Sequence, residues 1–481
     1  MKDKRKISDL TGKKVVFIDW QYVFPGYGSR LRHEENPKST HAMVPRGINL
    51  EIFPPRVENL PVFSHEMPWE QGYIAGYSTV FRDEKTLKLY YEVFHQKNYD
   101  KWTDYDSFLC YAESKTGNIW KRPNLGLVNY HNNKENNILI TPETNPLGVG
   151  IHGSHIFKDS HGTKEERYKI SYCGPKGKTY GGSSPDGIHW NLKEKVLADT
   201  EAESQNIIYW DEELEKYIGY FRTWYKERRG IIRAESESFW NWPDFNEFDL
   251  IFISDPNQPP DSDYYTNGFH IWPGTTQEHR AYLMFPSIYH RTQDYLDTEM
   301  YVSRTGKQWF RPCKAPIKIT KDIYGIHHKG AIYFGRGIWE DEEPHTWNIF
   351  HSHYPHGHND PKPEGNTGGL FKAQYREDGF MGLKAANFGE FWTTIFCNSS
   401  PHLKVNTLTG DPGFIEIGLY DQLTQREIPG FTVDDCDLLN GDIYWKTVSW
   451  NGEEDLSYFD DVKLRLHIKM KQTALFALKF E

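Results

Sequence analysis

Four short segments of this chain resemble one another, and this internal repeat limits the possible fold more than any other feature. They span residues 111–120, 182–190, 233–240 and 301–309. Each copy ends a strand near Ser, turns tightly, usually at Gly, and opens the next strand with Trp. A weaker fifth copy lies at 374–380. Ordinary hairpin turns would explain one copy but hardly five, so the pattern indicates a repeat architecture.

A second repeated unit precedes each copy and consists of two strands around a polar turn. It occurs at 76–94, 154–172 and 206–222, with weaker versions at 268–289 and 330–354. The two units together supply the four strands of one blade, and their fivefold repetition predicts a five-bladed β-propeller. We expect strands from residues 13–65 to complete the last blade, because a closed ring leaves no exposed sheet edge.

The pattern changes after residue 400. Segments 414–420 and 462–468 alternate apolar and polar residues, as half-buried strands do, and 475–480 reads as a final strand. We find no long stretch with helical periodicity. The predicted fold is therefore all-β, with a five-bladed propeller over residues 1–400 and a C-terminal β-sandwich over residues 401–481.

Charge and composition exclude several classes of partner. The net charge is −11 without a basic patch, which argues against nucleic acid, and no apolar run reaches the roughly 18 residues of a membrane helix. The five cysteines form no CxxC pair, so we expect reduced thiols. The cytoplasm is the expected compartment, or secretion if a leader has been removed. The 15% aromatic content suits strand packing and also sugar stacking.

The repeat predicts which residues face the central mouth of a propeller. The innermost strand of each blade starts there and the second strand ends there. Besides other polar residues, these positions include His152, His155, Glu203, Tyr265, His328, Glu92, Arg222 and Trp224. Convergent polar groups of this kind are typical of a site for a small polar ligand.

Three acids could supply the two carboxyl groups that glycoside cleavage needs. Asp19 interrupts an apolar strand, Glu203 begins the third blade, and Glu92 ends a strand of the first. Each also has a structural interpretation. Asp19 could cap a turn, Glu203 could bond within the ring, and Glu92 could lie on a solvated strand face.

The histidines of residues 351–358 suggest a metal, but an i, i+2 pair in this segment lacks the three or four ligands of a zinc site. We expect neither a metal nor a cofactor. Arg222, Arg228 and Arg229 could clamp an anion, or could pair with surface acids.

The chain resembles the five-bladed glycoside hydrolases of families 32 and 43, and more closely an uncharacterised bacterial glycosyl-hydrolase-like group. The matching pieces are residues 17–19, 136–138, 184–190, 203–206, 428–431 and 464–480. The resemblance implies that an acid at Asp19 is nucleophile or base and that a mid-chain Glu is the acid. The fructosidase motif Trp-x-Asn-Asp-Pro-Asn is absent, and Asp83 falls in a turn at the far side, so no stabilising role is transferred to it.

These features together predict a glycosidase acting on a carbohydrate. Asp19 is expected to act as base or nucleophile, Glu203 as general acid, and Glu92 to orient or tune a partner. Arg222, His155 and His328 are expected to bind sugar hydroxyls or an acidic substituent, with His152, Tyr265 and Trp224 beside them. Two alternatives keep the same pocket: a phosphorylase that replaces water by phosphate, and a non-catalytic glycan-binding propeller.

Overall fold

The computed structural model describes residues 7–26, 43–58, 60–70, 73–94, 106–245, 249–254, 258–312, 330–354, 356–359 and 368–481. The described chain is built from β-strands, and its helical structure is limited to short 3-10 turns. The all-β prediction is confirmed. In the part of the chain that the structure describes, no helix has the length and apolar character to cross a membrane.

Two compact units divide the chain, and they do not follow the boundary expected at residue 400. The first takes in residues 1–53, 271–281 and 377–481, and the second takes in 54–270 and 282–376. The first unit is therefore assembled from three separate stretches. Its N-terminal stretch joins the sheet of the C-terminal residues because β2 (Lys14–Val16) pairs with β32 (Leu464–Phe480).

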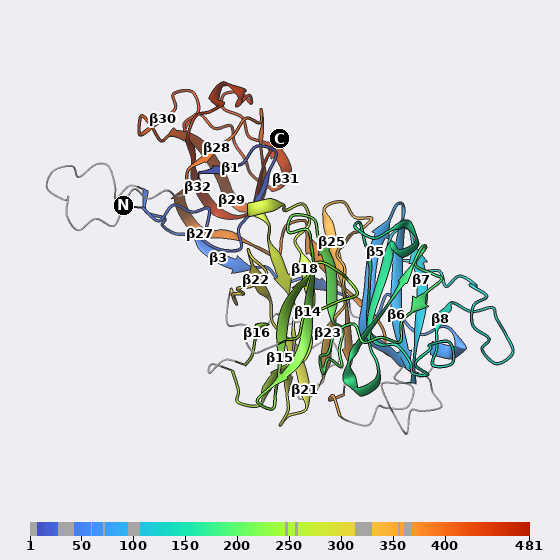
Figure 1. Ribbon diagram of the computed structural model, residues 1–481. Coiled ribbons are helices and arrows are strands. Elements are labelled where there is room, and N and C mark those ends of the chain that lie inside the picture. The colour runs from blue at the N-terminus through green and yellow to red at the C-terminus, as the bar shows by residue number, and fades with distance from the viewer. Residues whose placement is uncertain are drawn as a thin grey trace. The chain divides into compact units, whose positions relative to one another are not determined.

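The second unit contains three four-stranded antiparallel sheets, each built from consecutive strands, as the repeat predicts (Figure 1). The first sheet is β5 (Tyr73–Asp83), β6 (Thr86–Phe94), β7 (Ser107–Ser114) and β8 (Ile138–Ile140). The second is β9 (His152–Lys158), β10 (Tyr168–Cys173), β11 (Thr179–Ser184) and β12 (Asn191–Leu192). The third is β13 (Ile207–Asp211), β14 (Lys216–Tyr225), β15 (Arg228–Ser236) and β16 (Leu250–Phe252).

The rest of this unit corrects the expected blade count from five to four. Its fourth large sheet has eight strands: β17 (Ser262–Tyr264), β20 (Ser287–His290), β21 (Tyr295–Thr298), β23 (Ala331–Phe334), β24 (Trp339–Glu340), β25 (Thr346–Tyr354), β26 (Phe371–Arg376) and β4 (Arg56–Val57). The strands expected for two separate blades are joined because β21 and β23 pair in parallel at Leu296 and Ala331. A further three-stranded sheet contains β18 (Phe269–Ile271), β19 (Tyr282–Met284) and β22 (Tyr301–Ser303).

The repeated turns share one hydrogen-bonding pattern. In three copies a Ser hydroxyl accepts the backbone N–H of a Gly three residues later, at 2.9 Å in each case: Ser114 from Gly117, Ser184 from Gly187, and Ser303 from Gly306. All three glycines have positive φ, between 69° and 87°. A side chain at these glycines would clash with a ring from another sheet, that of Trp339, Tyr90 or Tyr220 respectively. The repeat thus specifies both the turn and a contact between sheets.

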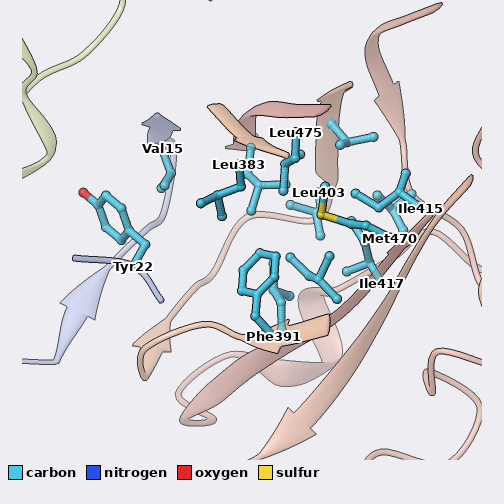
Figure 2. Close-up of a cluster of buried hydrophobic side chains, with 14 of the residues drawn as sticks. Val15, Tyr22, Leu383, Phe391, Leu403, Ile415, Ile417, Met470 and Leu475 are labelled. Carbon is cyan, nitrogen blue, oxygen red and sulfur yellow. The ribbon is translucent and has the colours of Figure 1, made fainter. Parts of the chain in front are cut away.

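The first unit is a single nine-stranded sheet around one apolar core. Its two long strands, β29 (Leu403–Asp421) and β32, pair over most of their length, with register shifts after Asn406 and Thr409. The other strands are β1 (Ser8–Asp9), β2, β3 (Asn49–Ile52), β27 (Met381–Trp392), β28 (Phe396–Cys397), β30 (Arg426–Glu427) and β31 (Asp442–Thr447). Figure 2 shows Val15, Leu383, Phe391 and Met470, from distant parts of the sequence, pointing into this core.

Candidate functional site

A pocket with a cavity volume of about 60 Å³, open to solvent, lies within the second unit. The starts of β5, β9 and β23, the segment after β17, and the ends of β6 and β25 contribute to its wall. The lining residues are Ala75, Gly76, Tyr77, Phe94, His152, Tyr265, Ala331, Tyr333, Tyr354, His356 and His358. Starts of inner strands and ends of second strands are the positions from which the repeat predicts a ligand site. Three residues named from the sequence occur in this group or behind it: His152 and Tyr265 line the wall, and Glu92 contacts His152.

Aromatic rings form most of the pocket wall and contact one another edge to face. The rings of Tyr77 and Tyr333 are 5.7 Å apart, those of Tyr265 and Tyr333 are 6.1 Å apart, and those of Tyr265 and His358 are 4.8 Å apart. Burial, followed by the neighbouring Tyr265 and Tyr333, raises the pKa of Tyr77 well above its usual value. The phenols therefore stay neutral and offer both apolar faces and hydroxyl groups.

A buried carboxylate supports His152 at this wall. Glu92 is completely buried, and its Oε1 lies 2.7 Å from His152 Nδ1 while its Oε2 accepts the N–H of Gly153 at 3.0 Å. Tyr77 and Phe94 enclose the imidazole, with ring separations of 5.4 and 5.6 Å. Glu92 therefore reaches the pocket through the imidazole, and this arrangement fixes the orientation of a histidine that could transfer a proton.

Arg222 and Glu203 form an ion pair close to Tyr265. Arg222 Nη2 lies 3.4 Å from Glu203 Oε2, and the guanidinium lies 5.0 Å from the centre of the Tyr265 ring. Arg222 is only 1% exposed, whereas Glu203 is 46% exposed. Burial lowers the pKa of Arg222, but Tyr265, Tyr77 and Glu203 raise it by more, so the net shift is upward. The guanidinium is charged, and it favours the ionised form of a nearby carboxyl group.

Trp224 lies farther along the same strand and is partly exposed. Arg229 stacks on it at 4.3 Å and also approaches the rings of Tyr265 and Tyr289. The completely buried Asp263 holds Arg229 at 3.1 Å and Arg228 at 3.0 Å. The arginine cluster expected from the sequence is therefore partly neutralised by one carboxylate, which the sequence analysis did not single out.

Asp19 lies in the other unit. Its Oδ1 accepts the backbone N–H of Gln21 at 3.0 Å, in a turn that follows β2. This is the turn-capping interpretation given above. The catalytic role expected for Asp19 stays a prediction and is not part of the proposal below.

His155 is buried in β9. Its Nδ1 accepts the N–H of Ile208 at 3.3 Å, its ring stacks on Phe157, and burial holds its pKa well below the usual value. It is not among the residues that line the pocket. His328, the other histidine expected to bind substrate, lies outside the described residues.

Among the described residues no group of three or more potential ligands is placed to hold a metal ion. His351 and His353, the pair considered from the sequence, are both buried in β25. Four wall residues were not predicted from the sequence: Tyr333, Tyr354, His356 and His358. These residues lie close to the start of β23 or the end of β25, and the repeat places such strand ends at the central mouth. Their position in the repeat could therefore have identified them.

No protein-family model and no curated protein sequence matches this chain. Solved structures do show similarity. The catalytic domain of a family 62 α-L-arabinofuranosidase from Coprinopsis cinerea is 10% identical, with 67% of this chain and 97% of that chain covered and a TM-score of 0.44. A Bombyx mori family 32 β-fructofuranosidase is 10% identical over 88% of this chain and 94% of that chain, with a TM-score of 0.41.

A third similar structure is a family 43 arabinoxylan arabinofuranohydrolase from Bacillus subtilis, solved in complex with cellotetraose. It is 8% identical over 87% of this chain and 99% of that chain, with a TM-score of 0.40. Identities and TM-scores this low assign neither a family nor an activity to this chain.

Proposed function

We propose that this protein is a glycoside hydrolase whose substrate binds in the aromatic pocket of the second unit. The observation that carries the proposal is the pairing of His152 with the buried Glu92 at a wall built from tyrosine and phenylalanine rings. Aromatic faces suit the apolar face of a sugar ring. The imidazole supplies a proton-transfer group at the same wall.

In the proposed reaction, water forms a bond to the anomeric carbon while the glycosidic C–O bond breaks. A base takes the proton of the water, and an acid gives a proton to the departing oxygen. His152, supported by Glu92, acts as the acid. Glu203 does not line the pocket, but it pairs with Arg222 behind the wall residue Tyr265, and we assign it the role of base because the guanidinium beside it favours its ionised form. Glu203 is thus the base in this proposal, whereas the sequence suggested that it is the general acid.

The test is to incubate the protein with a panel of plant and bacterial oligosaccharides and to measure new reducing ends by anion-exchange chromatography. The wild-type chain should cleave at least one substrate, and Glu203→Gln and His152→Asn should each lower kcat by about 100-fold or more. Glu84→Gln is the control, because Glu84 is exposed in the turn between β5 and β6. Equal activity in all four proteins would disprove the proposed roles.

One observation favours the non-catalytic alternative. No Asp or Glu occurs among the described residues that line the pocket, whereas glycosidases of the usual kind present two carboxyl groups to the substrate. A glycan-binding protein would retain an oligosaccharide without cleaving it. Binding measured by calorimetry, with no release of reducing ends after long incubation, would favour that alternative.

A further inference from the structure

Arg222 has donor groups that no described residue of the protein accepts. Its Nε and Nη1 atoms are buried and have no hydrogen-bond partner among the described residues. The third nitrogen, Nη2, makes the 3.4 Å contact with Glu203, which is long for a charge-assisted hydrogen bond. The backbone N–H of Arg222 donates to Asn206 Oδ1 at 2.9 Å and holds the residue in place.

Two buried carboxylates of this unit already have partners among the described residues. Glu92 accepts from His152 and Gly153, and Asp263 pairs with Arg228, Arg229 and Arg291. Neither contacts Arg222. A buried guanidinium with two unpartnered nitrogens is costly, because both its charge and its N–H groups have lost water. A ligand with a matching anionic group would remove that cost.

The guanidinium lies directly behind the pocket wall. The two tyrosines that most influence it, Tyr265 and Tyr77, both line the pocket, and the centre of the Tyr265 ring lies 5.0 Å from the guanidinium. A ligand in the pocket that moves the Tyr265 ring aside therefore reaches the guanidinium. The charge and the unpartnered nitrogens therefore stand at the ligand site and not at the outer surface.

We propose that Arg222 binds an oxyanion of the ligand that enters this pocket. The inference rests on the proposed function, which it deepens by naming the substrate class. Two sources have the required chemistry: the carboxylate of an acidic sugar, such as a uronic acid residue, and inorganic phosphate acting as co-substrate. In both, oxygens of one anion can accept from the planar guanidinium as a pair.

The experiment measures binding by calorimetry with four probes: galacturonate-containing oligosaccharides, the same oligosaccharides after reduction of their carboxyl groups, glucuronoxylan oligosaccharides and inorganic phosphate. It uses the wild-type chain and the variants Arg222→Met and Arg222→Lys. Arg122→Lys is the matched control. Arg122 is also buried and stacks on an aromatic ring, that of Phe63 at 4.1 Å, but it already pairs with Glu70 at 2.7 Å.

Arg222→Met should weaken binding of the anionic probe by about 30-fold or more, the size expected for loss of a buried charge-assisted contact. Arg222→Lys should recover only part of that loss, since it keeps the charge but not the planar fork. Arg122→Lys should bind as the wild-type chain does. If the protein prefers the carboxylate-containing oligosaccharides to the reduced ones, and this preference depends on Arg222, the bound anion is the sugar carboxylate. If phosphate binding depends on Arg222, the bound anion is phosphate.

Binding of neither anion, or anion binding that Arg222→Met leaves unchanged, would overturn the inference. The proposed hydrolysis fails differently. If oligosaccharides are cleaved but no anion binds, or Arg222→Met leaves anion binding unchanged, hydrolysis stands and the oxyanion site falls. If anions bind at Arg222 but no glycan is cleaved, the oxyanion site stands and hydrolysis falls.

Discussion

At the scale of single residues, the contact between Glu92 and His152 is the most informative. Glu92→Gln preserves the shape of the side chain but replaces one accepting oxygen by an NH2 group. The amide oxygen of the variant side chain would still accept the Gly153 N–H, so its NH2 group would face His152 Nδ1. Because that NH2 group is a donor, Nδ1 would have to be the acceptor, and the ring would carry its only proton on Nε2. The imidazolium form would be lost, and we expect kcat to fall by about 100-fold or more with KM little changed.

Kinetics of the Glu92→Gln variant and nitrogen chemical shifts of the His152 ring check this prediction together. Glu84→Gln serves again as control. A variant with wild-type kcat and an unchanged tautomer would show that Glu92 has only a structural role.

A second residue-scale prediction concerns acid stability. His351 is completely buried in β25 between Phe334 and Phe371, with ring separations of 5.7 and 5.6 Å, and burial lowers its pKa to about 3. In the unfolded chain the pKa is about 6.5, so the unfolded state binds the proton first as the pH falls. Stability is therefore complete above pH 6.5 and decreases between about 6.5 and 3.

Replacing His351 by Phe removes this loss. Relative to the wild-type chain, His351→Phe should gain about 2 kcal/mol in unfolding free energy between pH 7 and pH 5. His353, whose pKa burial lowers to about 4, titrates in both proteins and does not affect the difference. Urea unfolding of both proteins at pH 7 and pH 5 measures this difference in unfolding free energy. The exposed His131→Asn variant should keep the wild-type pH dependence, and an equal dependence in His351→Phe would contradict the account.

At the scale of elements, the repeated turns carry the most specific information. Gly187 combines φ +81° with a position against Tyr90, whereas Gly126 has φ +72° but open space around it. Gly126→Ala should therefore show the cost of positive φ alone, about 1 kcal/mol, and Gly187→Ala should lose about 2–4 kcal/mol. Thermal unfolding compares the two. Equal losses would show that the contact with Tyr90 adds nothing.

The turns also show what could be predicted from the sequence. The recurrence of Ser, Gly and Trp identified the hairpins and the pocket-facing strand ends, because a local turn imposes local residue types. The joining of β21 to β23 could not be predicted, since a parallel pairing at Leu296 and Ala331 leaves no turn signature. The place of residues 14–16 in the fold was equally hidden, because the pairing of β2 with β32 brings together residues more than 450 positions apart.

At the scale of the whole molecule, the three-part first unit makes a prediction about truncation. A chain ending at residue 400 loses β29 to β32, and β27 then lacks the strand with which it pairs from Leu383 to Trp392. Leu383 and Phe391 would lose their core neighbours. We expect this shortened chain to aggregate on expression. A soluble chain of residues 1–400 with a cooperative thermal transition would contradict the unit boundaries.

The measurement that tests the central claim most directly is to run the reaction in water enriched in oxygen-18 and to analyse the products by mass spectrometry. Hydrolysis at the pocket predicts one heavy oxygen at the anomeric position of each new reducing end, and about 100-fold less of this labelled product from His152→Asn incubations. A sugar phosphate without label would show phosphorolysis. Intact oligosaccharides throughout would contradict catalysis and leave the protein as a glycan-binding one.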